Sequence, residues 1–276
     1  MQLAYSLTGT GTDPQRVLIL VHGIMGSGRN WAGWARRLAS QWPAWRFMTV
    51  DLRHHGESVG AVSPDDLDAC AVDLEETVVA AGVRPSIAVG HSFGGKVVLA
   101  WTGRAPQGLR QAWVLDASPF AVGDGPLDVE VVGVVRAVAE MPGPFGSFEE
   151  VRDAFLARGF SSMLAGWMTT NLRREGAALV WRFNLDGVKA MLRSYVDTDL
   201  AWVWERGAAR IDLVLGGRSS RWSAGAVEEL VALAGPDHVH VLPDAGHWLH
   251  VDDPDGLLAL LSGALADADG GGTAGR

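Results

Sequence analysis

The stretch Val89-Gly90-His91-Ser92-Phe93-Gly94-Gly95 constrains the fold of this chain more than any other. An apolar run at 87–89 leads into it as a buried strand, and residues 96–101 behind it have the pattern of a helix. A serine at the centre of Gly-X-Ser-X-Gly fits a strained strand-to-helix turn that projects its hydroxyl above a sheet. The glycines lack a Cβ, so strand and helix can approach closely. We therefore expect Ser92 to be a nucleophile at the edge of a sheet.

Strands and helices alternate along most of the chain. Candidate strands lie at 2–7, 16–21, 46–50, 87–89, 111–115, 211–215 and 238–242. Candidate helices lie between them, including one that Ser63-Pro64 would open as N-cap and first-turn proline, and a last one at 254–265. This alternation predicts an α/β fold with a mostly parallel central sheet and helices on both faces.

Residues 120–210 interrupt the alternation before the penultimate strand. They contain no convincing strand and predict helices at 129–140, 148–158, 162–170 and 185–204. Such an insertion is most simply a helical cap over the carboxyl edge of the sheet, where open α/β sheets bind ligands. We expect a core of residues 1–119 and 211–268, a cap of residues 120–210, and a glycine-rich flexible tail of residues 269–276.

Composition excludes several classes of protein. With 48% hydrophobic residues the chain is globular, and its formal net charge of −9 argues against nucleic acid and anionic membrane surfaces. Its apolar runs are too short to span a bilayer, and no secretory signal is visible. The only cysteine, Cys70, rules out an intramolecular disulfide. We expect a cytoplasmic monomer or small homo-oligomer without a cofactor.

A serine hydroxyl needs an adjacent base to become a nucleophile at neutral pH. His247, in a Gly-His-Trp turn after the last strand, is the best candidate. His22 precedes Gly23 and is expected to shape a loop by side-chain hydrogen bonding, whereas His250 has the pattern of a helix surface position. No histidine has a metal-ligand spacing with cysteine or carboxylates, so no metal is expected.

These features together resemble the α/β-hydrolase superfamily over nearly the whole chain. Local strings are also similar to small bacterial esterases related to the mammalian α/β-hydrolase domain-containing protein 11. The strings are Asp51-Leu52-Arg53-His54-His55-Gly56, Gly90-His91-Ser92-Phe93-Gly94-Gly95-Lys96, Leu115-Asp116-Ala117-Ser118-Pro119, Thr170-Asn171-Leu172 and Trp181-Arg182-Phe183-Asn184-Leu185. The resemblance implies an α/β-hydrolase fold and a catalytic triad in the chain order Ser, acid, His.

The acid of the triad departs from the usual superfamily position. Many members place it after the strand that corresponds to 211–215, but here residues 216–222 contain no carboxylate. The resemblance implies that Asp116 acts instead, because its strand neighbours that of Ser92 in the superfamily, and that Ser219 supports the acid–His pair. Asp116 could also simply form the turn before Ser-Pro. Asp244 is a poorer candidate for the acid, and Asp197 and Asp199 are more remote ones.

Backbone N–H groups stabilise the oxyanion of a tetrahedral intermediate. The residue after the nucleophile, Phe93, is expected to supply one, and Ile24 the second, with Met25 as the next candidate. The side chains expected to line or border the substrate pocket are Met25, Met163, Trp167, Met168, Trp222 and Trp248. Several of these belong to the apolar cap, so we expect an apolar substrate portion.

The sequence therefore predicts a serine carboxylic-ester hydrolase that acts on small-molecule acyl esters of short to medium chain length. A thioesterase, lactonase, acyltransferase or carbon–carbon bond hydrolase would show the same triad, and a ligand-binding protein can use the same scaffold. Haloalkane dehalogenases and epoxide hydrolases of this fold need aspartate as nucleophile, which Ser92 excludes.

Overall fold

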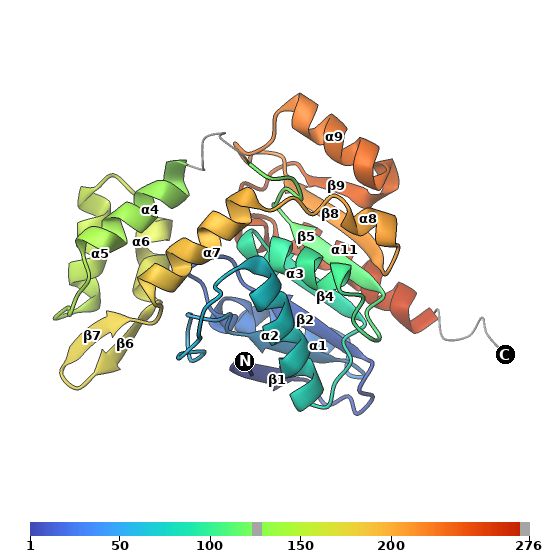
Figure 1. The fold of residues 1–276 in the computed structure, drawn as a ribbon, viewed down its shortest axis with the longest axis horizontal. Helices are drawn as coiled ribbons and strands as arrows, with labels where there is room; N and C mark the ends of the chain where they lie inside the picture. The colour runs from blue at the N-terminus through green and yellow to red at the C-terminus, as the bar shows by residue number, and fades with distance from the viewer. Residues whose placement is uncertain (123–128, 271–276) are drawn as a thin grey trace.

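A computed structural model describes residues 1–122 and 129–270 of the chain. Its centre is a seven-stranded sheet of order β1-β3-β2-β4-β5-β8-β9 (Figure 1). The strands are β1 (Tyr5–Thr8), β2 (Val17–Val21), β3 (Arg46–Val50), β4 (Ile87–His91), β5 (Gln111–Leu115), β8 (Arg210–Gly216) and β9 (Val239–Leu242). Only β1 is antiparallel to its neighbour, so the predicted mostly parallel sheet is confirmed.

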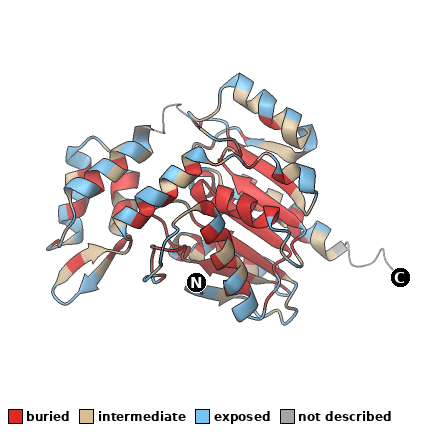
Figure 2. Ribbon diagram, viewed as in Figure 1, coloured by how far each residue is buried: buried red, intermediate tan, exposed pale blue. Residues whose placement is uncertain are grey.

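Helices cover both faces of this sheet. One face packs against α2 (Leu67–Ala80), α3 (Phe93–Gly103), α8 (Val203–Arg206) and α9 (Ala224–Ala234), and the other against α1 (Ala32–Gln41) and α11 (Pro254–Gly270). Short helices η1 (Gly28–Trp31), η2 (Pro236–His238) and α10 (Leu249–Asp252) complete the body. Figure 2 shows that burial concentrates in the central strands and in α3, which is buried on every side.

The start of α2 differs from the prediction. Asp66 is the N-cap, and its carboxylate accepts a hydrogen bond from the Ala69 N–H at 2.7 Å. Ser63 and Pro64 lie in the loop before it. Aspartate and serine are both good N-caps, and the Ser-Pro pattern concealed the correct one three residues later.

The inserted segment lies beside the body and contains α4 (Val129–Glu140), α5 (Phe148–Ala157), α6 (Ser162–Thr169) and α7 (Leu185–Asp197) (Figure 1). The prediction that it lacks strands is wrong, because β6 (Leu172–Glu175) and β7 (Ala178–Trp181) form an antiparallel hairpin. Each strand has only four residues, too few to show a clear alternation. The helix predicted at 185–204 is also interrupted, because Thr198 is extended after α7.

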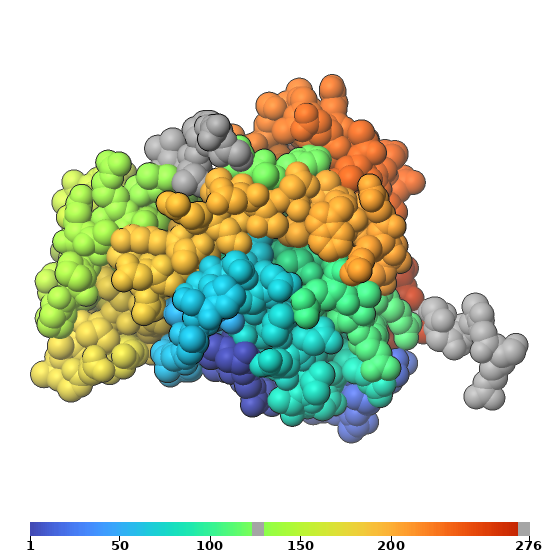
Figure 3. Space-filling view, in the orientation of Figure 1, coloured from blue at the N-terminus to red at the C-terminus, as the bar shows by residue number. Residues whose placement is uncertain are grey.

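Two contacts fix the inserted segment to the body. At one end of α7, Gly187 passes so close to the His54 ring that a Cβ would lie 2.6 Å from Nε2 of His54. At the other end, the buried Lys96 ammonium of α3 donates to the carbonyls of Phe120, Tyr195 and Thr198 at 2.7–2.8 Å. Figure 3 shows the amber α7 running over the surface of the body.

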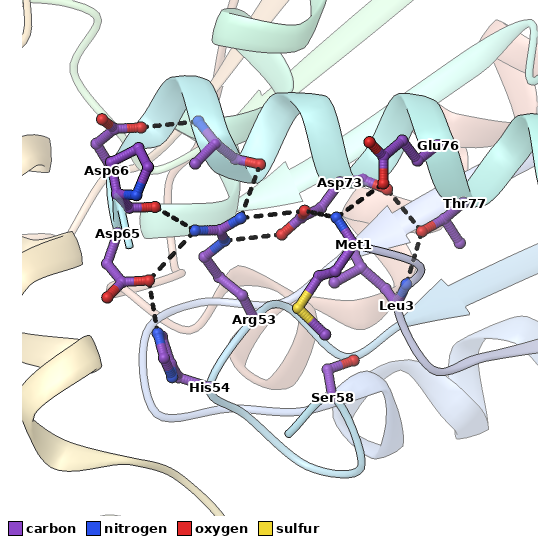
Figure 4. A network of polar contacts seen from close by, with 12 residues as sticks. Met1, Leu3, Arg53, His54, Ser58, Asp65, Asp66, Asp73, Glu76 and Thr77 are labelled. Atoms are coloured by element: carbon purple, nitrogen blue, oxygen red, sulfur yellow. Dashed lines mark hydrogen bonds and ion pairs between the residues drawn. The ribbon is translucent and has the colours of Figure 1, made fainter. Parts of the chain in front are cut away.

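His54 is itself held in place by a network of charged groups on α2 and its preceding loop (Figure 4). Its Nε2 lies 2.6 Å from Oδ1 of Asp65, which also pairs with Arg53 at 3.2 Å. Arg53 donates to the fully buried Asp73 at 2.7 Å. The surface on which Gly187 packs is therefore fixed by the body.

The chain's last helix is longer than predicted. α11 extends to Gly270 and so includes Asp269 and Gly270, two residues that the prediction assigns to the flexible tail. The remaining part of that predicted tail, 271–276, lies outside the described residues. Residues 123–128 of the predicted cap lie outside them too.

Candidate active site

Ser92 lies between the end of β4 and the start of α3, with φ of 53° and ψ of −119°. Positive φ strains a residue that has a Cβ, and such strain is typical of functional turns. Close packing holds the turn, since a Cβ on Gly90 would lie 2.7 Å from the Gly95 nitrogen, and one on Gly94 would lie 2.7 Å from the Val21 oxygen. The Ser92 N–H donates to the carbonyl of Leu115 at 2.8 Å. The neighbouring strand β5 thus anchors the turn.

Asp116 and His247 meet at the same edge of the sheet. Asp116 follows β5, and its N–H donates to the Val214 carbonyl of β8 at 2.8 Å. His247 lies on the loop after β9, and its Nδ1 donates to Oδ2 of Asp116 at 2.7 Å. Ser92 and His247 line the same two hollows. The structure therefore brings together the three residues predicted to form the triad.

The Asp116 carboxylate accepts three further hydrogen bonds. Oδ1 accepts from the Gly216 N–H at 2.9 Å and the Trp222 indole at 2.6 Å, and Oδ2 accepts from the Ser219 hydroxyl at 2.7 Å. Burial alone would raise the pKa of Asp116, but the hydrogen bond and charge of His247, with the Gly216 and Trp222 donors, lower it overall. The carboxylate is therefore ionised and can stabilise an imidazolium.

The loop that lacks a carboxylate thus supplies donors to Asp116. Sequence reasoning assigned Ser219 to this role but placed Trp222 only in the pocket, and it missed the Gly216 N–H. A tryptophan in a loop after a strand has no sequence pattern that would predict a hydrogen bond from its indole to Asp116. The competing acid Asp244 forms an exposed ion pair with Arg218 instead.

Two histidines shape the loop after β2. Nδ1 of His22 donates to the Gly23 carbonyl at 2.7 Å, and its Nε2 accepts from the Leu52 N–H at 2.9 Å. Nε2 of His55 accepts the Met25 N–H at 2.9 Å, so this N–H is already engaged. Of the two N–H groups considered for this loop, only that of Ile24 lacks an acceptor among residues 1–122 and 129–270. The role of His55 was missed, since only its turn position is visible in the sequence.

Buried histidines surround the site in their neutral form. Burial lowers the pKa of His22 and of His250 to about 4 and that of His55 to about 3, and it lowers the pKa of His91 well below its usual value. His91 also donates to the His247 carbonyl at 2.8 Å. The predicted surface position of His250 is wrong: it is 9% exposed and lines the hollow at Ser92, because α10 packs its imidazole against Trp31 and His91.

The hollow in front of Ser92 is mainly apolar. We call it the apolar pocket; Met25, Trp31, Val134, Leu164, Trp167 and Trp248 contribute its apolar walls. A second, more open hollow at Ser92 includes Ser219 and Trp222. Of the predicted pocket residues, Met25, Trp167, Trp222 and Trp248 therefore lie around the site.

Two predicted pocket residues lie elsewhere. Met168 is wholly buried in the core of the inserted segment with Leu164 and Ala165, because these positions share one face of α6. Met163 is 48% exposed and borders a neighbouring surface hollow with Trp167, not the apolar pocket. Sequence periodicity does not tell which side of a cap helix faces the cleft.

Within residues 1–122 and 129–270, no three His, Cys, Asp or Glu side chains are grouped as ligands for a metal ion. No helix in the same ranges has the length and apolarity to cross a bilayer. The predicted cytoplasmic location and oligomeric state stay predictions.

Known proteins resemble the chain over almost its full length. A model described as "Alpha/beta hydrolase family" matches residues 18–260. The mouse (Mus musculus) "sn-1-specific diacylglycerol lipase ABHD11" is 28% identical over 273 residues, which cover 96% of this chain and 86% of that protein. "Esterase YbfF" of Escherichia coli (strain K12) is 28% identical over 263 residues, which cover 91% of this chain and 93% of that protein.

A solved structure shows the same fold. The "Marine microorganism esterase" aligns with a TM-score of 0.81 at 22% identity and covers 94% of this chain and 98% of its own. Together with the family match across most of the sequence, this architecture shows that the chain belongs to the alpha/beta hydrolase family.

Proposed function

We propose that this protein is a serine carboxylic-ester hydrolase in which Ser92, His247 and Asp116 form the catalytic triad. The observation that carries the proposal is the 2.7 Å contact between Nδ1 of His247 and the buried carboxylate of Asp116. This contact fixes the imidazole tautomer that leaves Nε2 free to accept a proton. The relatives whose names include esterase and diacylglycerol lipase support hydrolysis of esters.

The reaction proceeds by two acyl transfers. Oγ of Ser92 attacks the ester carbonyl while Nε2 of His247 takes the hydroxyl proton, and the imidazolium is stabilised by Asp116. The tetrahedral intermediate collapses when His247 returns this proton to the departing alcohol, leaving an acyl group on Ser92. Water, deprotonated by His247, then attacks the acyl-enzyme and releases the carboxylic acid.

The oxyanion of each tetrahedral intermediate would be stabilised by the N–H groups of Phe93 and Ile24. Phe93 is the first residue of α3, where backbone N–H groups have no partner within the helix. Each such donor contributes about 3 kcal/mol to transition-state stabilisation. The Met25 N–H, which His55 holds, would instead keep the loop in place.

The apolar pocket favours substrates with a short or medium acyl chain. Most of its wall is formed by indole and aliphatic side chains, and its polar side chains are histidines, Ser92, Asn30 and Glu130. Such a wall suits a hydrocarbon better than a sugar or peptide. Small-molecule acyl esters are therefore the proposed substrates, and the thioesterase, lactonase and acyltransferase alternatives share the same acyl-enzyme.

The test compares wild-type protein with Ser92→Ala on p-nitrophenyl acetate and butyrate, followed by a chain-length series of esters and thioesters. We expect the variant to keep its fold, measured by circular dichroism, and to lose more than about a thousandfold in turnover. Turnover of Ser92→Ala close to the wild-type value would contradict covalent catalysis. Thioester turnover far above that of matched esters would assign the protein to the thioesterases.

A further inference from the structure

A further hollow, distinct from the two at Ser92, is lined by four arginines. We call it the arginine hollow; its guanidinium groups belong to Arg29, Arg173, Arg174 and Arg182. Arg29 lies on η1 of the body, while the other three flank or lie on the β6–β7 hairpin of the inserted segment. None of its described lining residues is acidic. This positive concentration contrasts with the formal net charge of −9 for the whole chain.

Not all of these charges are neutralised by the protein. Arg182 has a structural role, because it donates to Glu57 at 2.6 Å and to the Leu172 carbonyl at 3.0 Å. Arg173 meets Glu175 at 3.4 Å on the surface. Among residues 1–122 and 129–270, ion pairs within 4.0 Å join Arg173 and Arg182 to carboxylates, but none joins Arg29 or Arg174 to one. Two guanidinium groups thus remain for an anion, which they can bind through paired hydrogen bonds.

Asn30 connects the arginine hollow to the apolar pocket, since it lines both. Its Oδ1 accepts the Ser27 N–H at 2.8 Å, so its NH₂ group is the part that can donate to a ligand. The hydroxyls of Thr169 and Thr170 donate to carbonyls of their own helix at 2.7 Å. The donors offered to an anion are therefore the arginines and Asn30.

We propose that the arginine hollow binds the terminal phosphate or carboxylate of an amphiphilic molecule whose hydrocarbon part lies in the apolar pocket. The arginines of one hollow and the apolar walls of the other suit the two halves of such a molecule, and Asn30 lines both hollows. A guanidinium group favours phosphate and carboxylate by its charge and by its planar geometry. If the proposed function holds, the substrates are acyl esters with an anionic far end, and the arginine hollow determines this specificity.

The experiment measures binding, so it does not depend on turnover. Isothermal titration calorimetry with the full-length Ser92→Ala protein compares octyl phosphate with its neutral dimethyl ester, and suberic acid monomethyl ester with dimethyl suberate. The first pair tests phosphate and the second tests carboxylate. We expect at least one anionic probe to bind about tenfold or more tightly than its neutral partner.

The variant Arg29→Glu/Arg174→Glu should abolish this preference, and the milder Arg29→Gln and Arg174→Gln should each reduce it. Arg152→Glu is the matched control, because Arg152 is an exposed arginine on α5 that pairs with Asp153 and does not line the arginine hollow. This control should keep the full preference. Unchanged melting temperatures verify that each variant is folded.

Several results would overturn the proposal. They are equal binding of charged and neutral probes, a preference that survives in the charge-reversed and Gln variants, and binding to anionic lipid vesicles without binding to either soluble anion. Loss or retention of ester turnover in Ser92→Ala leaves these outcomes unaffected, so failure of the proposed function would be distinguishable.

Discussion

Nδ1 of His247 lies 2.7 Å from Oδ2 of Asp116, although 131 positions separate the two residues in the chain. The sheet brings them together, because β5 pairs in parallel with β8, and β8 with β9. Leu115 pairs with Val214 and Gly216 with Leu242, so the loops that carry both residues emerge at one edge. Adjacent strands are about 4.8 Å apart, and β8 in between contributes its Gly216 N–H to the same carboxylate.

We expect the buried neutral histidines to make stability depend on pH between about 4 and 6.5. The folded-state pKa of His250 is lowered to about 4 by burial and by His247, so the unfolded chain binds one more proton in this window. Stability from His250 is thus fully present above pH 6.5 and is lost as pH falls to about 4. In His250→Gln, the free energy of unfolding should fall less steeply across this range. An unchanged slope in chemical denaturation would contradict a neutral buried His250.

Gly187→Ala should disturb the packing of α7 on the body. The new Cβ would lie 2.6 Å from Nε2 of His54, and the bond to Asp65 keeps that ring from moving away. We expect a loss of about 1–3 kcal/mol in the free energy of unfolding. Gly166→Ala is the control, because its Cβ meets nothing within 4 Å inside α6 and should be neutral or stabilising. Equal stability of the two variants would show that this close contact is unimportant.

Lys96→Met should be severely destabilising. It leaves the carbonyls of Phe120, Tyr195 and Thr198 without the ammonium that now donates to all three. Each buried unsatisfied group costs about 1–3 kcal/mol of stability, so the melting temperature of the variant should be much lower than that of the wild type. The chain's other lysine, Lys189, is 48% exposed, and Lys189→Met should change stability by less than about 0.5 kcal/mol. Similar melting temperatures for the two variants would contradict the inference that the hydrogen bonds of Lys96 hold the inserted segment on the body.

Trp167→Ala and Met168→Ala should affect different properties although the residues are adjacent: the first the acyl-chain preference, the second the stability. Trp167 lines the apolar pocket with Ser92, so its truncation should move the optimum towards longer acyl chains. Met168 is fully buried in the segment's core, so its truncation should cost about 2–5 kcal/mol of stability and leave the chain-length profile unchanged. Profiles of p-nitrophenyl esters for the two variants provide the measurement. A shift in Met168→Ala, or none in Trp167→Ala, would contradict this assignment of the pocket.

The sequence predicts much of the sheet because buried strands and their terminal motifs are local signals. Each parallel strand follows from a short apolar run, and the turn at Ser92 follows from the apolar run before it and the glycines around it. The hairpin of β6 and β7 could not be found in this way, because four-residue strands lack a detectable period.

Side-chain contacts between distant segments could not be predicted either. Neither the bond from Trp222 to Asp116 nor that from Met25 to His55 leaves a sequence pattern, because each depends on how two loops meet after folding. The burial of Met168 has the same origin, since the orientation of α6 is set by the helices packed around it.

The central claim is that Asp116 serves as the acid for His247. The direct test is kcat/KM of Asp116→Asn on an unactivated ester, where a good leaving group cannot hide the loss of acid–base catalysis. We predict a loss of about ten-thousandfold, because asparagine favours the wrong imidazole tautomer. Ser219→Ala removes one supporting hydrogen bond and should cost about fivefold, and Asp244→Asn should remain close to wild type. A near-normal Asp116→Asn enzyme, or a deeper loss in Asp244→Asn, would contradict the claim.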